Sequence, residues 1–544
     1  MKLTEPEYIT CDVLVIGGGG AGLRAAIEAR EKGASVTLVS KSPVGLGNNT
    51  VISKGAFAVA AGWSNPDDSI EIHIRDTLEA GRFINDRRLV ERIASGIIDE
   101  VPFLEKCNVP FDKEGQKFRI TRSPGHTYPR SIRAKSHLGT SFTLPLKQYA
   151  SQIGVSFSDK VFISRLMNGG SGVSAAGIDR QGHFLVFTPK AVILATGGFG
   201  QLYKYTNNAV GITGDGHALA FRFGVPLRDM EFVQFYPTAI GGIRMLLYET
   251  FVFRNGAILK NALGEDIIEK HGIKDPMLMT RDRVARAIMQ EILAGLHVNG
   301  GVIMDVRPIP DETLFKFRPL LPPAALGGQR EFIVLPTVHF CSGGIITDAE
   351  AQTCKPALFA CGEVSGGAHG ANRLGTNALS EVFVMGRVAG NNAAQFARES
   401  PLAKPDPDKV NAEKARLEAF LGEGSGDIKG LTHSIKEVAW YQTGIIRHKA
   451  GLERAVNTIK DIRSSAQKIR VPDIKGLISL LELENMLLVG EMVSQAALKR
   501  RESRGVHYRE DYPQEDAKWQ ATLISTNRAG SVVIEKKSVA TAKK

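Results

Sequence analysis

The stretch Cys11-Asp12-Val13-Leu14-Val15-Ile16-Gly17-Gly18-Gly19-Gly20-Ala21-Gly22-Leu23-Arg24-Ala25-Ala26 decides the fold of this chain. An apolar run leads into a glycine cluster and then into an alanine-rich segment, which predicts a strand, a tight turn and a helix. Gly17, Gly19 and Gly22 occupy the positions of a G-x-G-x-x-G pattern, and residues 36–39 form the next apolar run. In that pattern the glycines permit the turn, the approach of a pyrophosphate and the packing of helix on strand. The stretch therefore predicts a βαβ unit that binds a dinucleotide at the N-terminus of its helix.

The overall composition is that of an enzyme with several domains. The chain has 544 residues, of which 43% are hydrophobic and 57 are glycine. This length exceeds what one hydrophobic core supports, so we expect two or three domains. No run reaches the roughly 18 apolar residues of a membrane-spanning helix. Glu5 and Glu7 near the N-terminus do not fit a secretory or transit peptide, so we expect a cytoplasmic protein.

Cysteine spacing and net charge limit the cofactors and partners. The five cysteines form no C-x-x-C pair and no cluster-ligand spacing, so we expect neither a disulfide framework nor a metal or iron–sulfur site. The formal net charge is +11, but no basic stripe interleaved with aromatic residues accompanies it. An anionic cofactor, an anionic substrate or an acidic partner explains the charge better than a nucleic acid. Part of it comes from a lysine-rich end expected to be disordered: Lys536, Lys537, Lys543 and Lys544.

Further glycine-rich segments are expected to line the same dinucleotide. Small and polar residues fill 44–51 and 54–58, and the apolar run 191–195 ends in Thr196-Gly197-Gly198. Thr213-Gly214-Asp215-Gly216 then opens a helix. The Asp215 carboxylate either accepts a hydrogen bond from the cofactor or serves only as the helix N-cap.

The rest of the chain divides into segments of different character. Residues 67–108 and 140–152 are expected to be helical, and 240–345 is expected to form an inserted domain with a long helix near 280–296. The strand-and-glycine pattern returns at 358–363. A linker follows at 401–407, and amphipathic helices fill roughly 406–500.

Several blocks, in this order, resemble the fumarate reductase/succinate dehydrogenase flavoprotein family, which also contains L-aspartate oxidase and adenylylsulfate reductase. The resemblance spans almost the whole chain. Besides the N-terminal glycine pattern, the matching blocks are Ala195-Thr196-Gly197-Gly198, Asp229-Met230-Glu231-Phe232-Val233-Gln234, Thr280-Arg281-Asp282-Arg283-Val284, His339-Phe340-Cys341-Ser342-Gly343-Gly344, His369-Gly370-Ala371-Asn372-Arg373-Leu374-Gly375-Thr376-Asn377-Ala378-Leu379 and Glu502-Ser503-Arg504-Gly505 with His507.

The resemblance implies an α/β fold built on a Rossmann-like FAD-binding domain. This domain is expected in two parts, residues 1–239 and 346–405. An inserted α+β capping domain is expected at 240–345, and a C-terminal helical domain with a tail at 406–544.

The cofactor implied by the resemblance is FAD. The second strand ends in Ser40 and Lys41, the pair that this family uses, and not in the acidic residue of NAD sites. Glu363 matches the acid that binds the ribityl chain. Covalent members carry a histidine near the position of Asn49, so we expect a non-covalent flavin. The expected FAD-binding residues are Gly17, Gly19, Gly20, Ala21, Gly22, Ser40, Lys41, Asn48, Asn49, Thr50, Gly55, Ala195, Thr196, Gly197, Asp215, Glu363, Arg373, Ala378 and Leu379.

The resemblance also implies a reaction. In the family, a hydride passes between the flavin and a carbon–carbon double bond conjugated to a carboxylate, and cations polarise that bond. Arg373 and His339 match the residues that bind the substrate carboxylate, and Arg281 matches the proton donor. Glu249 matches the acid of the proton relay.

Two departures from the family pattern concern the substrate. Tyr236 stands where the family has a second substrate-binding histidine, so it can donate a hydrogen bond but carries no positive charge. Residues 250–255 hold one extra residue and lack the usual order of the relay. A substrate with one free carboxylate, or with an amide or thioester at its other end, fits these departures, and so does catalysis in the dehydrogenation direction.

We expect a fumarate reductase/succinate dehydrogenase-like catalytic subunit that acts on a small carboxylate. Its electrons are expected to pass to an iron–sulfur partner, which can also attach the complex to a membrane. One alternative is an L-aspartate oxidase, which residues 505–507 and 511–513 resemble, and adenylylsulfate reductase is a further one. The last alternative is a flavin electron-transfer subunit whose substrate site has changed.

Overall fold

A seven-stranded sheet carries the glycine-rich stretch at the edge where its parallel strands end. In the computed structural model, which describes residues 2–169, 172–241, 255–273, 281–316, 327–402, 404–424 and 426–539, the strand order is β7-β2-β1-β10-β9-β8, and β17 also pairs with β10. The strands are β1 (Glu7–Ile16), β2 (Val36–Ser40), β7 (Ser156–Asp159), β8 (Phe162–Gly169), β9 (Gly172–Ile178), β10 (Phe184–Leu194) and β17 (Leu358–Ala360). Ile16 is in register with Val39 and with Leu194 in the two parallel neighbours. The predicted βαβ unit is confirmed, and its turn lies level with the ends of both neighbouring strands.

Two helices, α1 (Gly20–Glu31) and α12 (Asn377–Glu399), pack on this sheet. Around them, α5 (Thr140–Gln152) packs on α1, α4 (Arg87–Lys106) packs on α12, α3 (Ile70–Ala80) packs on α4, and the short α2 (Asn49–Ile52) packs on α5. A Cβ at Gly390 of α12 would lie 2.3 Å from the Ala25 carbonyl oxygen of α1, so only glycine permits this approach. A buried ion pair between Arg24 and Glu100, 2.7 Å apart, joins α1 to α4. The helices expected at 67–108 and 140–152 are confirmed.

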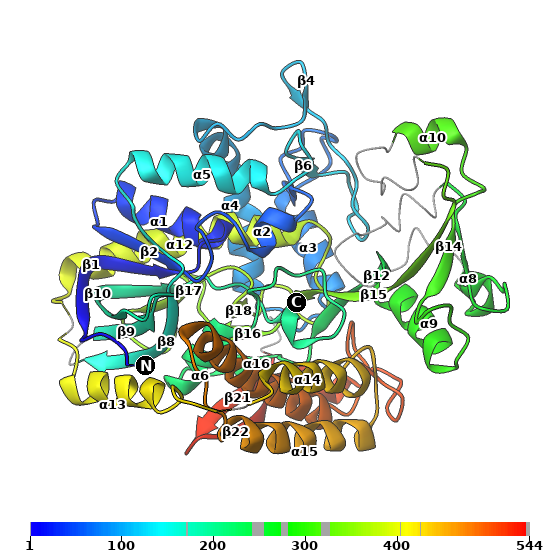
Figure 1. Cartoon of the computed structure of the whole chain (residues 1–544). Helices are drawn as coiled ribbons and strands as arrows, with labels where there is room; N and C mark the ends of the chain where they lie inside the picture. Colours follow the sequence, from blue (N-terminus) through cyan, green and yellow to red (C-terminus); the bar gives the residue numbers. More distant parts are fainter. Residues whose placement is uncertain are drawn as a thin grey trace.

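The described residues also form three small strand pairs and a short helix. They are β3 (Ala56–Ala58) with β6 (Ser131–Arg133), β4 (Lys113–Glu114) with β5 (Lys117–Phe118), β19 (Ile446–Arg447) with β20 (Tyr508–Arg509), and the 3₁₀ helix η1 (Gly200–Leu202). The β4–β5 hairpin projects from the top of the molecule in Figure 1.

A separate four-stranded antiparallel sheet and its helices form the part of the molecule at the right of Figure 1, which we call the capping part. Its strands, in order, are β12 (Val233–Ile240), β15 (Glu331–Cys341), β14 (Val302–Asp305) and β13 (Ile258–Lys260), and its helices are α8 (Ile267–Lys270), α9 (Arg281–Leu293) and α10 (Asp311–Lys316). Leu259, Ile288 and Val334 belong to its own hydrophobic core. The expected boundary at residue 240 coincides with the end of β12, so this strand precedes the boundary although it belongs to the sheet. The other ends of β12 and β15, where Val233 is in register with Cys341, join the capping part to the rest of the chain.

A five-stranded sheet includes the last described residues of the chain. Its order is β18 (Ser365–Gly366), β16 (Gly344–Ile346), β11 (Leu227–Arg228), β21 (Ala521–Arg528) and β22 (Ser531–Ser538). Lys536 and Lys537 lie in β22, and the Lys536 ammonium is 4.1 Å from the centre of a Trp519 ring. The expectation of a disordered end is wrong for these two lysines, because their strand pairs with β21 along its whole length. Lys543 and Lys544 lie outside the described residues.

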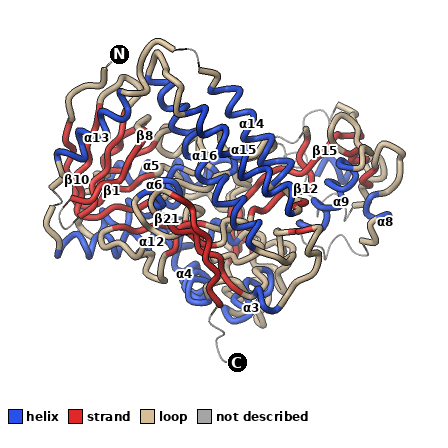
Figure 2. The backbone as a smooth tube through the Cα atoms, turned by 90° about the horizontal axis from the view of Figure 1, so that it is seen from below, coloured by secondary structure: helices blue, strands red, loops and turns tan. Residues whose placement is uncertain are grey.

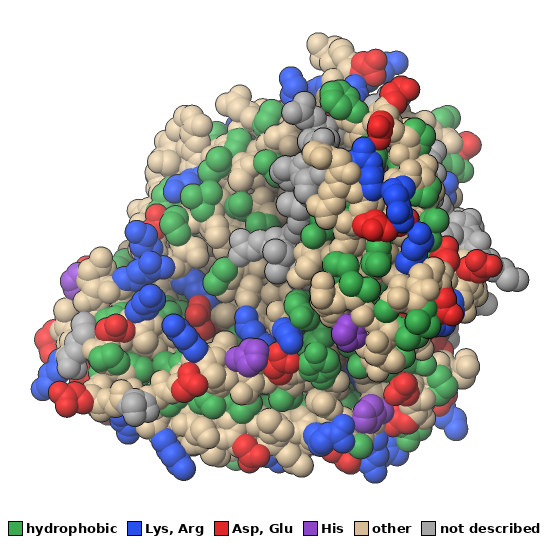
Figure 3. Space-filling model, turned by 45° about the vertical axis from the view of Figure 1, so that its right-hand side comes forward, with side chains coloured by type: hydrophobic (Ala, Val, Ile, Leu, Met, Phe, Trp, Pro, Cys, Tyr) green, Lys and Arg blue, Asp and Glu red, His purple; other side chains and the backbone are tan. Residues whose placement is uncertain are grey.

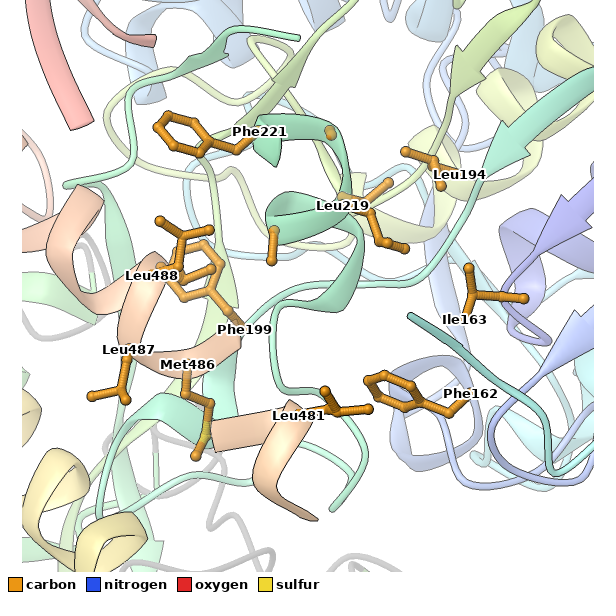
Figure 4. Packing of buried hydrophobic residues seen from close by; sticks show 14 of the residues in the cluster. Phe162, Ile163, Leu194, Phe199, Leu219, Phe221, Leu481, Met486, Leu487 and Leu488 are labelled. Atoms are coloured by element: carbon orange, nitrogen blue, oxygen red, sulfur yellow. The ribbon is translucent and has the colours of Figure 1, made fainter. Parts of the chain in front are cut away.

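Four helices of the C-terminal part lie along the underside of the molecule (Figures 1 and 2). They are α13 (Pro407–Glu418), α14 (Ile428–Gln442), α15 (Lys449–Ala466) and α16 (Ile474–Lys499). Helix α16 has apolar residues on all its sides, and most of its residues are buried, which is typical of a helix in a protein core. Figure 4 shows Leu481 and Leu488 of α16 near Phe162 and Phe199, within the same core as α6 (Asp215–Arg222). Within the described part of the chain, no helix has the combined length and hydropathy needed to cross a membrane.

The surface charge is mixed where it can be seen. On the side of the molecule shown in Figure 3, Lys and Arg side chains form small separate groups, with Asp and Glu side chains among and beside them. The excess positive charge therefore forms no continuous stripe on this face.

Candidate functional site

A cavity of about 1050 Å³ opens at the ends of β1, β2 and β10 and extends to the capping part. The expected site residues that line it are Gly17, Gly19, Gly20, Ala21, Ser40, Lys41, Asn48, Asn49, Thr50, Ala195, Thr196, Gly197, Asp215, Tyr236, Arg281, His339, Glu363, Arg373, Ala378 and Leu379. Gly22 and Gly55 are not among its lining residues. Glu249 lies outside the described residues. The structure thus collects into one cavity side chains that are far apart in the sequence.

The glycine turn has the geometry of a pyrophosphate site. Gly17 has a φ of +122°, and a Cβ there would lie 2.2 Å from the Ala195 carbonyl oxygen. A Cβ at Gly22 would lie 1.9 Å from the Gly17 oxygen, so this glycine serves packing and not cavity lining. A Cβ at Gly19 would meet nothing closer than 3.6 Å, in the Asn48 side chain. Gly19 is also the N-cap of α1 and provides no side-chain cap, so the first turn of the helix presents amide N–H groups where an anion binds.

A half-buried ion cluster lies at one part of the cavity, which Lys41 and Asp215 line. Lys41 Nζ lies 2.6 Å from Asp215 Oδ2 and 2.7 Å from Glu482 Oε1. Burial alone would lower the pKa of Lys41, but the two carboxylates raise it above its ordinary value. Asp215 is the first residue of α6 and Gly214 is the N-cap, so the alternative that Asp215 only caps the helix is wrong. Its carboxylate fixes the charged form of Lys41.

Asn49 is hydrogen-bonded through both its amide nitrogen and its amide oxygen on the wall of the cavity. Its Nδ2 donates to Glu363 Oε2 at 2.9 Å and to Asn208 Oδ1 at 2.8 Å, and its Oδ1 accepts from the Ala209 amide at 3.0 Å. Burial raises the pKa of Glu363, although Asn49 and the Cys341 amide donate to its carboxylate. Asn49 and Glu363 are thus bonded to each other, and both line the cavity.

One buried polar atom on the cavity supports the fit of a cofactor. The Thr196 hydroxyl has no hydrogen-bond partner among the residues that the structure describes, and Thr196 lines the cavity directly after β10. A buried hydroxyl without a partner is costly, so a ligand group is the natural partner. Together with the open turn at Gly19, this hydroxyl fits FAD, which the residues at the ends of β1 and β10 would hold.

Arg373 supplies a buried cation at the other end of the cavity. Its Nη2 donates to Gln234 Oε1 at 3.0 Å, its Nη1 donates weakly to the Leu374 carbonyl at 3.4 Å, and its guanidinium lies 4.8 Å from the Phe340 ring centre. Within the described chain its Nε finds no hydrogen-bond acceptor. Burial, and then the nearby Arg281, lowers the pKa of Arg373 to about 9, so the guanidinium remains charged at neutral pH. An anion in the cavity would relieve both the unpaired N–H and the repulsion between the two arginines.

His339 and Tyr236 complete this end. His339 Nδ1 lies 3.0 Å from Asn207 Nδ2 and 3.4 Å from Asn207 Oδ1, and the shorter contact favours the tautomer with the ring proton on Nε2. Burial, and then Arg373 and Arg281, holds the pKa of His339 well below its ordinary value, so the ring is neutral. Its ring centre lies 5.6 Å from that of Tyr236. Arg281, the first residue of α9, places its guanidinium carbon 4.9 Å from the Tyr236 ring centre.

Several cavity residues were not singled out from the sequence. Asn207 and Asn208 hold His339 and Asn49, and the only sequence signal for them is their position just before the Thr213-Gly214 turn. Gln234 lay within a matching block without an assigned role. The loop at 121–127, which includes His126, and Asn255 also line the cavity. Their roles depend on tertiary contacts that no local pattern reveals.

Two family models match the chain. The model described as "FAD binding domain" matches residues 12–379, and the one described as "Fumarate reductase flavoprotein C-term" matches residues 432–544. The first covers more than half of the chain and includes both ends of the cavity. These matches agree with the FAD-binding fold and with FAD as the cofactor.

Known proteins of the same kind align over nearly the full length. A fumarate reductase (CoM/CoB) subunit of Methanothermobacter marburgensis is 36% identical over 96% of this chain and 98% of its own length. L-aspartate oxidase of Pyrococcus horikoshii is 34% identical over 92% of this chain and 95% of its own length. The solved E. coli quinol fumarate reductase superposes with a TM-score of 0.89 at 28% identity, covering 98% of this chain and 97% of that one. The chain is thus an FAD-dependent oxidoreductase that belongs to the fumarate reductase/succinate dehydrogenase flavoprotein family.

Proposed function

We propose that this chain interconverts a carbon–carbon double bond and single bond next to a carboxylate, with fumarate and succinate as the reference pair. The observation that carries the proposal is the convergence of Arg373 and Arg281 beside the neutral His339 in the FAD cavity. Two cations in a buried space attract a carboxylate and stabilise negative charge that develops on the conjugated system. Bound FAD supplies hydride transfer.

Each residue has a distinct proposed role. Arg373 binds one carboxylate through the N–H groups that its protein partners leave available, including Nε. His339 donates a hydrogen bond from Nε2 to the same carboxylate in the tautomer in which its Nδ1 accepts from Asn207 Nδ2, the shorter of its two contacts with that side chain. Arg281 delivers the proton to the carbon next to the one that exchanges the hydride. A guanidinium is a poor acid in water, so this role requires the dry cavity and a relay. We propose Glu249 for the relay.

Tyr236 sets the character of the distal end of the substrate. It is buried, and its ring lies close to both His339 and the Arg281 guanidinium. A hydroxyl can bind a carboxylate, an amide or a thioester oxygen, but it adds no charge there. The proposed substrates are therefore enoates with one obligatory carboxylate, and fumarate is the first to test.

The proposed cofactor state and assembly follow from the same residues. We propose that FAD binds without a covalent bond, because Asn49 offers an amide in place of an imidazole. We also propose that an iron–sulfur subunit exchanges electrons with this chain in the cytoplasm, and that it can anchor the complex to a membrane. The net charge of +11 supports an acidic partner surface. The names of the relatives that are subunits support a complex of several chains.

The L-aspartate oxidase alternative rests on the relative from P. horikoshii and on the block at 505–507. In this structure His507 is fully buried, and its Nδ1 lies 2.6 Å from Arg447 Nη1. His507 is not among the lining residues of the cavity, so this block does not decide the substrate. The same assay therefore tests an amine substrate.

The experiment uses the purified FAD-loaded protein without oxygen. The flavin is reduced with dithionite, excess dithionite is removed, and fumarate is added while flavin absorbance is followed. Rapid reoxidation that is lost in Arg281→Ala but kept in Arg283→Ala, an exposed position on the same helix, supports the proposal. Reduction of the oxidised flavin by L-aspartate, without reoxidation by fumarate, would favour the oxidase. No response to either ligand would favour an electron-transfer subunit.

A further inference from the structure

Two neighbouring residues of the capping part meet two neighbouring residues of the FAD-binding part beside the cavity, and Arg281 and Arg373 line it. Arg281 and Asp282 begin α9, whereas Asn372 and Arg373 lie in the loop before α12. Asn372 Nδ2 donates a hydrogen bond to Asp282 Oδ1 at 3.2 Å. The helix that carries the proposed proton donor is thus bonded directly to the residue before the proposed substrate arginine.

The hydrogen bonds continue from Asn372 to the guanidinium. Gln234 Nε2 donates to Asn372 Oδ1 at 2.8 Å and to the Arg373 carbonyl at 2.9 Å. Gln234 Oε1 then accepts from Arg373 Nη2 at 3.0 Å. Gln234, Asn372 and Arg373 are all at most 6% exposed, so water competes little for these bonds.

The direction of this chain of bonds requires an acceptor at position 282. If Gln234 turned its amide around, its NH₂ would face the Arg373 guanidinium, and two donors would oppose each other. Its observed orientation directs the NH₂ at Asn372 Oδ1, which in turn directs the Asn372 NH₂ at residue 282. A carboxylate accepts there, and an alanine would leave the last donor without this bond.

The chain of bonds also preserves the charge of Arg373. Gln234 is a neutral acceptor, so it fixes one N–H of the guanidinium without neutralising the cation. The remaining N–H groups, including Nε, stay oriented for a ligand in the cavity.

We propose that Asp282 is a positioning residue that orients Arg373 for the substrate carboxylate through Asn372 and Gln234. This inference rests on the proposed function, because it takes Arg373 as the carboxylate ligand. When α9 lies against the loop before α12, the bond between Asp282 and Asn372 then fixes the positions of both the proton donor Arg281 and the substrate-binding Arg373. By linkage, a carboxylate bound at Arg373 holds the capping part in its docked position.

The test measures fumarate binding to the oxidised FAD-loaded protein by titration calorimetry, where no net reaction occurs. We expect Asp282→Ala to weaken binding about tenfold, the effect of one buried hydrogen bond, and Asp282→Asn, which retains an acceptor oxygen, to weaken it less than threefold. Glu269→Ala, an exposed acid of the same part of the chain, is the matched control and should bind as the wild type does. FAD content and the thermal midpoint report folding in each variant. Binding by Asp282→Ala within twofold of the wild type would overturn the inference, and so would an equal loss in Asp282→Asn.

A second readout separates this inference from the proposed function. If the wild type binds no fumarate, the proposed function fails, and hydrogen–deuterium exchange without ligand then tests the bond chain. Faster exchange at 369–376 in Asp282→Ala, absent in Glu269→Ala, would support the positioning role. Unchanged exchange in that segment would overturn it.

Discussion

The Nδ2 of Asn49 donates to Glu363 Oε2 at 2.9 Å, on the wall of the FAD cavity. An amide nitrogen is not a nucleophile, and this one is engaged by both Glu363 and Asn208. We therefore expect the flavin to appear in the supernatant after acid precipitation of the protein, measured by its absorbance. Flavin that stays with the pellet through a wash in denaturant would contradict this expectation.

Two glycines of the first turn should respond differently to alanine. A Cβ at Gly22 would lie 1.9 Å from a backbone oxygen, so Gly22→Ala should yield little folded protein. A Cβ at Gly19 meets no protein atom within 3.6 Å, so Gly19→Ala should fold with a normal circular dichroism spectrum but lose bound FAD. The measurement is flavin per chain after gel filtration. Full FAD content in Gly19→Ala would show that the pyrophosphate lies elsewhere.

Changing Gln234 to glutamate should weaken the binding of the substrate although Arg373 is still present. A carboxylate in place of Oε1, which now accepts from Arg373 Nη2 at 3.0 Å, would pair with the guanidinium and compete with the substrate. We expect the KM for fumarate to rise at least tenfold in Gln234→Glu, measured with a reduced dye as electron donor. The control is Gln290→Glu, an exposed position on α9. An unchanged KM would mean that Arg373 does not bind the carboxylate.

Buried histidines should make the fold sensitive to acid. Burial lowers the pKa of His73 to about 3, and of His126 and His217 to about 4, from an ordinary value near 6.5. Below about pH 6.5 the unfolded chain binds protons that the native chain does not, so stability is present above this pH and falls as the pH drops toward 4. Three such protons give a slope of at most about 4 kcal/mol per pH unit.

Urea unfolding between pH 7.5 and 5 measures this effect. The urea midpoint should fall with the pH, and His217→Leu should reduce the slope by about a third of the contribution of these three histidines. A pH dependence identical to that of the wild type would show that His217 does not carry one of these protons.

The sequence predicted the parts of the fold that local patterns encode. The run into Gly17 predicted β1 and α1, and the run into Thr196 predicted β10, because apolar strands that end in glycine are local signals. The hairpin β21–β22 was missed, because its alternation is weak and Lys536 and Lys537 suggested a solvated end. Its pairing with Leu227 and Arg228 comes from a distant part of the chain.

The site residues that could be predicted are those that the family resemblance assigns a role. Arg281, His339 and Arg373 were singled out, and they line one cavity. Asn207 and Asn372 were not assigned roles, because an asparagine acquires one only through its orientation in a hydrogen-bond network. Residues 242–254, which hold Glu249, lie outside the described structure, so the relay remains a proposal.

The pairing of β11 with β21 has a consequence for biosynthesis. Leu227 of β11 leaves the ribosome long before Ser525, its strand partner, has been translated. Until then β11 lacks one of the two strands that flank it in the complete structure, and open edges recruit other strands. A strand near the C-terminus, β21, therefore covers the edge of a strand that is synthesised much earlier, β11. A product that terminates before residue 521 would retain every cavity residue named above and still expose an adhesive strand.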